Sequence, residues 1–119
     1  MEEENSKRFD LEERTFQFAG RTRAFVKALA KTIGNIEDAR QLIRSSGSVG
    51  ANYIEANEAL SKKDFVLHIK ICRKEAKESR YWLRLIEALD AGPAGERESL
   101  LQEAQELMNI FGSIIRKSE

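Results

Sequence analysis

The 119-residue sequence has only one cysteine, one histidine and one proline. A single cysteine excludes an intramolecular disulfide, and one cysteine with one histidine are too few ligands for a structural zinc site. The sequence has no run of about 18 apolar residues, so no membrane-spanning helix is expected. Its polar start, MEEENSKRFD, is unlike a signal peptide. These absences favour a cytoplasmic protein that uses no metal, no cofactor and no membrane.

The charges balance, because 20 residues are basic and 20 are acidic, and the formal net charge is zero. A neutral chain has no overall attraction to nucleic acid or to a membrane surface, so only a local patch of charge can provide one. Apolar residues make up 41% of the sequence, which is enough to form the core of one domain.

Apolar residues recur at three- and four-residue spacing along the chain, which predicts four helices and no strand. The first helix is expected over residues 10–33, with Gly34 ending it and Asn35 capping the second. Ser61 begins a capping-box variant before the third helix, and residues 91–95 are expected to break the chain before the fourth. The predicted core seams contain Leu11, Phe18, Phe25, Val26, Leu29, Ile33; Ile36, Ala39, Leu42, Ile43, Val49, Tyr53, Ile54; Phe65, Ile69, Cys72, Ala76, Ser79, Leu83, Ile86; and Leu100, Leu101, Ala104, Leu107, Met108, Phe111, Ile114, Ile115.

Short connections between these helices favour antiparallel neighbours. The predicted fold is therefore an all-α, up-down-up-down antiparallel four-helix bundle. Residues 9–119 are expected to form this single domain, and residues 1–8 a mobile tail.

The third helix has two further strips beside its core seam, as a helical wheel at 3.6 residues per turn indicates. One strip is apolar and consists of Leu67, Ile71, Trp82 and Leu85. Glu75 and Glu78 lie among these residues on the wheel. The other is basic and consists of Lys70, Arg73, Lys77, Arg80 and Arg84. A helix in a small monomeric bundle needs one apolar stripe. Either neighbouring helices of the same chain cover the second apolar strip, or copies of the chain pack through it, and we favour self-association.

The segment SSGSVGANYIEANEALS, residues 45–61, is rich in small residues. Such residues let two helix backbones approach closely, and Ser48, Asn52 and Glu55 can supply hydrogen bonds in a tight seam. The competing interpretation is a phosphate-binding loop. No lysine or arginine adjoins the glycines, and neither a sheet nor a Walker ending is present, so the helix interpretation is favoured.

Two segments also resemble signatures of a known family. Residues 45–56, SSGSVGANYIEA, and residues 74–83, KEAKESRYWL, are similar to the second- and third-helix signatures of the four-helix-bundle family named for proteins encoded in 23S rRNA intervening sequences. Ser61 and Phe65 also fit, and the resemblance covers about residues 15 to 115. It implies a ring-shaped homopentamer of largely unassigned molecular function. A related branch, the accessory protein of diversity-generating retroelements, is basic and works with nucleic acid, whereas this chain is neutral.

We therefore expect a non-enzymatic homo-oligomer that acts as an interaction scaffold, with an unidentified protein as a further candidate partner. The residues predicted for the interface are Ser48, Asn52, Glu55, Ile71, Glu75, Glu78, Trp82 and Leu85. The alternative is an RNA- or DNA-binding accessory protein that uses the basic strip. The null explanation of that strip is a solvated face with ordinary ion pairs.

An enzyme is disfavoured. His68 lacks the Glu-x-x-His spacing of a di-iron site, and a buried, hydrogen-bonded structural role is expected for it. Cys72 lies on the core face without a base partner. Glu75 and Glu78 are one turn apart and resemble an acid–base or metal pair, but they are expected to pair with Arg40, Arg44 or Arg80.

Overall fold

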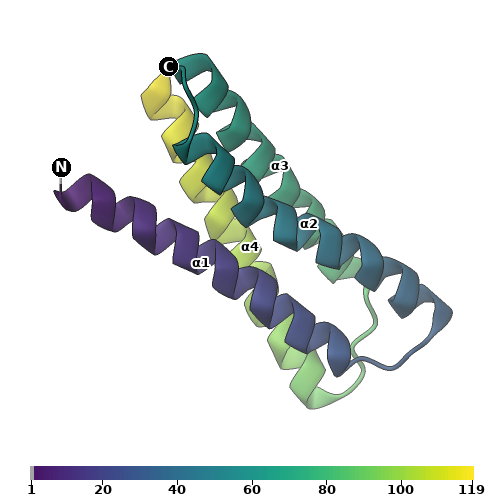
Figure 1. Cartoon of the computed structure of the whole chain (residues 1–119). Helices are drawn as coiled ribbons and strands as arrows, with labels where there is room; N and C mark the ends of the chain where they lie inside the picture. Colours follow the sequence, from purple (N-terminus) through teal and green to yellow (C-terminus); the bar gives the residue numbers. More distant parts are fainter. Residues whose placement is uncertain (1) are drawn as a thin grey trace.

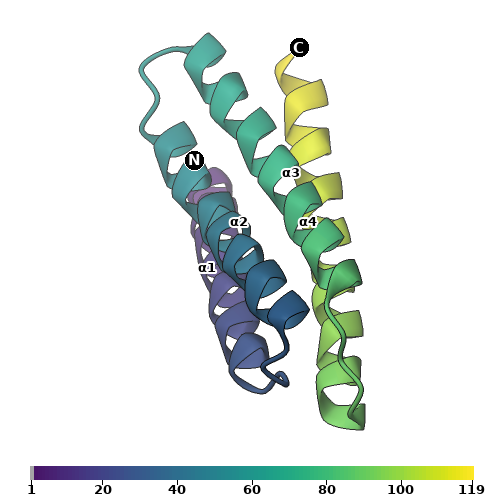
Figure 2. The ribbon, with the colours of Figure 1, turned by 90° about the vertical axis from the view of Figure 1, so that its right-hand side faces the viewer.

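The computed structural model describes the backbone of residues 2–119 and the side chains of residues 10–90 and 92–119. Four helices follow one another: α1 (Glu2–Lys27), α2 (Ile33–Asn57), α3 (Lys62–Leu85) and α4 (Ala91–Ser118). Each helix runs back along the preceding one, and α4 returns beside α1 (Figures 1 and 2). The result is the predicted all-α, up-down-up-down antiparallel bundle. The mobile tail predicted for residues 1–8 stays a prediction, because the side chains of these residues lie outside the described part of the chain.

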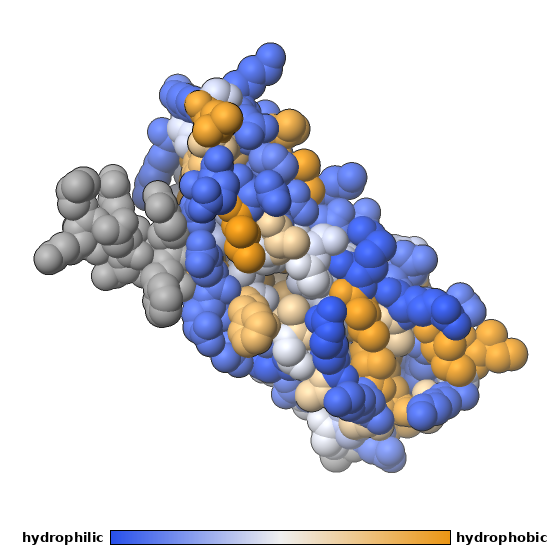
Figure 3. Space-filling view, viewed as in Figure 1, coloured by the Kyte–Doolittle hydropathy of each residue, from blue (hydrophilic) through white to orange (hydrophobic). Residues whose placement is uncertain are grey.

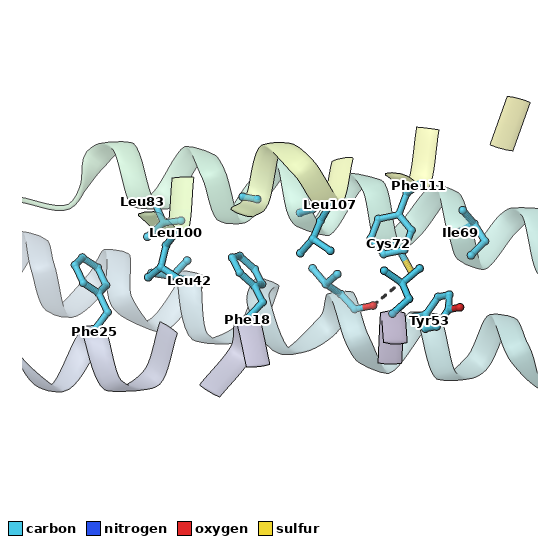
Figure 4. Close-up of a cluster of buried hydrophobic side chains, with 14 of the residues drawn as sticks. Phe18, Phe25, Leu42, Tyr53, Ile69, Cys72, Leu83, Leu100, Leu107 and Phe111 are labelled. Carbon is cyan, nitrogen blue, oxygen red and sulfur yellow. Dashed lines mark hydrogen bonds between the residues drawn. The ribbon is translucent and has the colours of Figure 1, made fainter. Parts of the chain in front are cut away.

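The core runs along the axis of the bundle and takes side chains from all four helices (Figure 4). Phe18, Leu42, Leu83 and Phe111 are among its fully buried members. The third-helix seam is confirmed, with Ile69, Cys72, Ala76, Ser79, Leu83 and Ile86 all buried and Phe65 partly buried. Burial of these apolar side chains is the main force that holds the helices together.

The predicted burial is wrong for three residues of the seams. Ile33, Ile36 and Ile54 are 85%, 41% and 53% exposed. Ile33 was expected to end the first helix, but it is the first residue of α2. Ile36 and Ile54 lie on α2, whose core-facing stripe is filled by other side chains.

The connection between α1 and α2 also differs from the prediction, because α1 ends at Lys27 and Gly34 lies inside the first turn of α2. Thr32 is the N-cap, and its hydroxyl accepts a hydrogen bond from the backbone N–H of Asn35. Asn35 is buried and has a different role. Its side chain donates to the carbonyls of Ala30 and Glu87, and its Oδ1 accepts from the Glu87 N–H. The side chain thus joins two connections at one end of the bundle.

Of the other two connections, only the one before α3 has a side chain that caps the following helix by a hydrogen bond. The predicted cap at Ser61 is confirmed, since its hydroxyl accepts from the Asp64 N–H at 3.1 Å. Residues 91–95 do not form a break, because α4 begins at Ala91 after an N-cap at Asp90. Pro93 therefore lies in the first turn of α4, where its missing N–H has no helical acceptor to lose.

Ion pairs join the edge at which α1 meets α4. Arg14 donates two hydrogen bonds of 2.8 Å to Glu103, and Arg21 contacts Glu96 at 3.1 Å. From the first pair to the second, the arginine position rises by seven residues and the glutamate position falls by seven, as expected for antiparallel helices held in a single register. The hydrogen bond to Glu103 raises the pKa of Arg14 further above its ordinary value. Within the described residues, no helix combines the length and the apolarity needed to cross a membrane.

Candidate functional surfaces on α3

Residues 45–57 of the small-residue segment, which include both glycines, lie within α2, so the loop interpretation does not hold. Its close approaches are made inside the chain. The Ser45 hydroxyl lies 2.9 Å from the Ser79 hydroxyl on α3, and a Cβ at Gly50 would lie 3.0 Å from Thr15 Oγ1 on α1. For Ser45 and Gly50, the predicted tight seam is therefore intramolecular, because α1 and α3 both pack against this part of α2.

The polar residues predicted for the interface follow the neighbouring face of α2. Asn52 is partly buried, its Nδ2 donates to the Ser48 carbonyl at 2.9 Å, and its Oδ1 lies 3.3 Å from His68 Nδ1 on α3. His68 is therefore partly buried and hydrogen-bonded, in agreement with the structural role expected for it. Glu55, one turn further along α2, is exposed.

Glu75 and Glu78 pair with an arginine, as expected, and the same arginine serves both. Arg44 on α2 lies 3.3 Å from Glu75 Oε2 and donates a hydrogen bond to Glu78. Glu75 is buried, whereas the Arg44 side chain is about half exposed. Glu75 Oε2 nevertheless has no hydrogen-bond partner among the described residues. A buried carboxylate oxygen without a hydrogen bond is costly for a chain on its own.

The second apolar strip of α3 is only partly covered by this chain. Ile71 and Trp82 are partly buried, while Leu67 and Leu85 remain 54% and 48% exposed. Trp82 Nε1 is buried and also lacks a hydrogen-bond partner among the described residues. The structure therefore brings an incompletely covered apolar strip and two unsatisfied polar atoms to the same side of α3.

Sequence inspection missed an apolar hollow of about 250 Å³ where α1 meets α2. Val26, Leu29, Ile36 and Ile43 contribute to its lining. Figure 3 shows apolar surface toward that end of the bundle, bordered by hydrophilic side chains. The hollow accounts for part of the exposure of Ile36.

The basic strip lies on another side of α3. Lys70, Arg73, Lys77 and Arg84 are exposed and Arg80 is partly buried. None of the five forms an ion pair within residues 10–90 and 92–119, whereas Arg14, Arg21, Arg44 and Arg97 all do. The strip therefore forms no ordinary ion pairs among the described side chains, whereas the solvated face that the null explanation also describes is observed.

Two surface hollows adjoin the ends of this strip. The first, of about 650 Å³, is lined by Lys62, Lys63 and Lys70, and also by Asp64, Val66, Leu67 and the C-terminal residues Ser118 and Glu119. The second, of about 300 Å³, is lined by Arg80 and Arg84 on α3 and by Glu98, Leu101, Gln102 and Gln105 on α4. Between these ends, a Cβ placed on Gly112 of α4 would lie 3.3 Å from Arg116 Nη1 and 3.9 Å from Arg73 Nε. Both guanidinium groups therefore lie over this glycine, and the basic surface extends from α3 onto α4.

The described residues show few of the features that a catalytic site needs, such as a reactive thiol or a cluster of metal ligands. Cys72 is buried, and burial raises the pKa of its thiol to about 12, so it is protonated at neutral pH. Its Sγ donates to the Val49 carbonyl at 3.4 Å. Among the described side chains, no group of three or more His, Cys, Asp or Glu residues is arranged to hold a metal ion.

Comparison with known proteins adds a family and a fold. The family model described as 23S rRNA-intervening sequence protein matches residues 7–113. A crystal structure of a protein of unknown function from the S23 ribosomal protein family of Bacteroides thetaiotaomicron is 32% identical to this chain. Their similarity covers 87% of this chain and 96% of that one, with a TM-score of 0.76. No match was found among the curated proteins.

Proposed function

Since the chain belongs to the 23S rRNA-intervening sequence protein family, we propose that it is a non-enzymatic homo-oligomeric scaffold. Copies of the chain associate through the surface formed by α2 and α3, which we name the α2–α3 face. This face comprises Ser48, Asn52, Glu55, Ile71, Glu75, Glu78, Trp82 and Leu85. A ring of five copies is the form that the family resemblance implies.

The observation that carries this proposal is the pair of unsatisfied atoms Glu75 Oε2 and Trp82 Nε1. Both atoms are buried and lack a hydrogen bond, although Glu75 Oε2 lies 3.3 Å from Arg44. A second copy around which this surface repacks can supply a further donor to the carboxylate and an acceptor to the indole. Leu67 and Leu85 lie on the same side of α3 and remain about half exposed. Apolar surface around a tryptophan is typical of the centre of a protein–protein interface.

Light scattering of the purified protein tests the assembly. Leu85→Glu is expected to shift the mass toward the monomer, because it places a charge in the apolar part of the interface. Leu89→Glu is the matched control, since Leu89 is 88% exposed in the connection before α4, and it should leave the mass unchanged. Trp82→Ala is also expected to yield monomer. A monomeric wild-type protein at micromolar concentration would overturn the proposal.

The second candidate function is binding of RNA or DNA by the basic strip, as in the accessory branch to which the sequence is related by resemblance. The specific observation in its favour is that five consecutive strip cations have no carboxylate partner among the described side chains. Unpaired cations in a row give sequence-independent phosphate binding. This binding weakens as the salt concentration rises, because the release of counterions from the nucleic acid then becomes less favourable. Because the net charge of the chain is zero, the attraction to phosphate comes from this one surface and not from the protein as a whole.

Fluorescence anisotropy with a labelled oligonucleotide at increasing salt tests this second function. Binding is expected at low salt, and Lys77→Glu with Arg84→Glu should abolish it. Lys31→Glu with Lys27→Glu changes the charge equally, but at exposed positions around the connection between α1 and α2, and should have little effect. No binding of wild type at low salt would exclude this function while leaving the scaffold proposal standing.

A further inference from the structure

Tyr81 is an exposed aromatic residue within the basic surface of α3. Its side chain is 54% exposed, and its neighbours one turn away on the helix are the exposed Lys77 and Arg84 on one side and Glu78 and Leu85 on the other. Its ring packs against Trp82 in a T-shaped arrangement, with the two ring centroids 5.0 Å apart and the ring planes at 79°. The phenol ring is thus held beside cations that have no carboxylate partner within the described residues.

Phe16 provides a useful contrast. It is 69% exposed on α1, and it is the other exposed aromatic side chain in the described part of the chain. Its neighbours one turn earlier are Glu12 and Glu13, so its surroundings are acidic. Exposure of an aromatic ring and proximity to unpaired cations are therefore combined only at Tyr81 among the described side chains.

We propose that Tyr81 stacks against a base of single-stranded nucleic acid whose phosphates contact Lys77, Arg84 and the rest of the basic strip. The inference rests on the second function proposed above and names the form of nucleic acid that this surface takes. An aromatic face next to cations is the common solution for binding single strands without sequence preference. The cations anchor the backbone, and the ring accepts any base because every base has a π face.

The geometry favours a single strand over a duplex. Bases inside a duplex are stacked on their neighbours and do not present a free face, whereas those of a single strand do. From Lys70 to Arg84 the strip extends over about 21 Å of helix, at about 1.5 Å per residue. That length corresponds to roughly six phosphates of a stacked strand at about 3.4 Å each. Tyr81 lies near one end of this track, close to the hollow lined by Arg80 and Arg84.

The test compares a labelled oligothymidine of about 12 nucleotides, the matching duplex, and inorganic polyphosphate. Wild type should bind the single strand more tightly than the duplex at equal salt. Tyr81→Leu should weaken single-strand binding about 5- to 150-fold and leave polyphosphate binding unchanged. Tyr81→Phe keeps the ring and should bind like wild type. Phe16→Leu is the matched control and should also bind like wild type.

The sole tryptophan offers a second readout. Because Trp82 contacts Tyr81, a base stacked on Tyr81 should quench the intrinsic fluorescence, and polyphosphate should not. Light scattering of each variant, with and without the oligonucleotide, checks that a change in affinity or fluorescence does not come from a change in assembly.

The outcomes separate the inference from the function on which it rests. If Tyr81→Leu binds the single strand as wild type does, while Lys77→Glu with Arg84→Glu abolishes binding, the basic surface binds phosphate and the stacking inference is wrong. Equal affinity of wild type for single strand and duplex also overturns the inference alone. If wild type binds none of the three polyanions at low salt, the inference and the second function both fail.

Discussion

The guanidinium of Arg44 on α2 lies 3.3 Å from the carboxylate of Glu75 on α3, and the same guanidinium also binds Glu78. The three side chains differ in exposure, because Glu75 is buried and its two partners are not. Arg44 is the cation that compensates the Glu75 charge on the side of α3 where we place the interface. It therefore contributes both to the stability of the bundle and to the surface presented to another copy.

Arg44→Met is expected to lower the free energy of unfolding by about 2 kcal/mol, because it leaves Glu75 buried without its cation. Chemical denaturation measures this loss. Glu78→Gln is the control and should cost less than about 0.5 kcal/mol, since the pair that it breaks is partly exposed to water. Arg44→Met combined with Glu75→Leu should recover most of the loss, and no recovery would mean that Glu75 does not depend on Arg44.

Asn35→Ala is expected to destabilise the bundle by about 2 to 3 kcal/mol. The substitution removes three buried hydrogen bonds, to Ala30 and Glu87, and each is worth about 1 kcal/mol. Thr32→Ala at the neighbouring cap should cost about 1 kcal/mol. If the two variants prove equally stable in urea, the contact between Asn35 and the connection after α3 contributes nothing.

The helical wheel of α3 predicted its strips well because helix geometry is fixed by the backbone and does not depend on the partners. The seam from Ile69 to Leu83 is buried, and the basic strip is mostly exposed. The pairing of Glu75 with an arginine was also predicted from sequence, because a carboxylate beside an apolar strip is stabilised by a cation nearby. The sequence left Arg40, Arg44 and Arg80 open, and the structure selects Arg44.

The connections were harder to predict because local signals there are compatible with more than one boundary. Gly34 and Asn35 form a plausible stop and cap, and Thr32 forms another cap two residues before Gly34. The choice depends on Asn35 binding Glu87, which is distant in sequence. In the same way, the small residues of α2 predicted a close approach but not its partner, which for Gly50 is Thr15 of the same chain.

The thiol of Cys72 is expected to be unreactive in the folded protein. Burial raises its pKa to about 12, and only the thiolate reacts with a disulfide reagent. At pH 8 a chromogenic disulfide reagent should therefore label the native protein very slowly and the urea-unfolded protein at the rate of a free thiol. Rapid labelling without denaturant would show that the core around Cys72 opens readily.

The raised pKa of Cys72 also has a consequence for stability at high pH. In the folded state the thiol keeps its proton up to about pH 12, whereas in the unfolded chain it ionises near its ordinary pKa of about 8.5. The unfolded state therefore binds fewer protons between these values, and the free energy of unfolding falls as pH rises through this range. Cys72→Ala should remove this part of the decline. Identical pH profiles for variant and wild type between about pH 8.5 and 11 would contradict it.

Gly50→Ala sets helix propensity against packing, and the two effects have opposite signs. Alanine favours an interior helical position by about 1 kcal/mol over glycine, but the added Cβ would lie 3.0 Å from Thr15 Oγ1 and 3.3 Å from Thr15 Cβ. The Cβ of Thr15 is fixed to the α1 backbone and cannot rotate away. We therefore expect a net loss of about 1 to 2 kcal/mol.

Gly20→Ala is the matched control, because nothing lies within 4 Å of its added Cβ, and it should stabilise the protein. Thr15→Ala should remove most of the loss caused by Gly50→Ala, because it removes the hydroxyl oxygen that would lie 3.0 Å from the added Cβ, although the Cβ of residue 15 at 3.3 Å remains. A loss for Gly50→Ala that persists in the Thr15→Ala background would show that the approach of α1 to α2 at this point is limited by the backbones rather than by the threonine side chain.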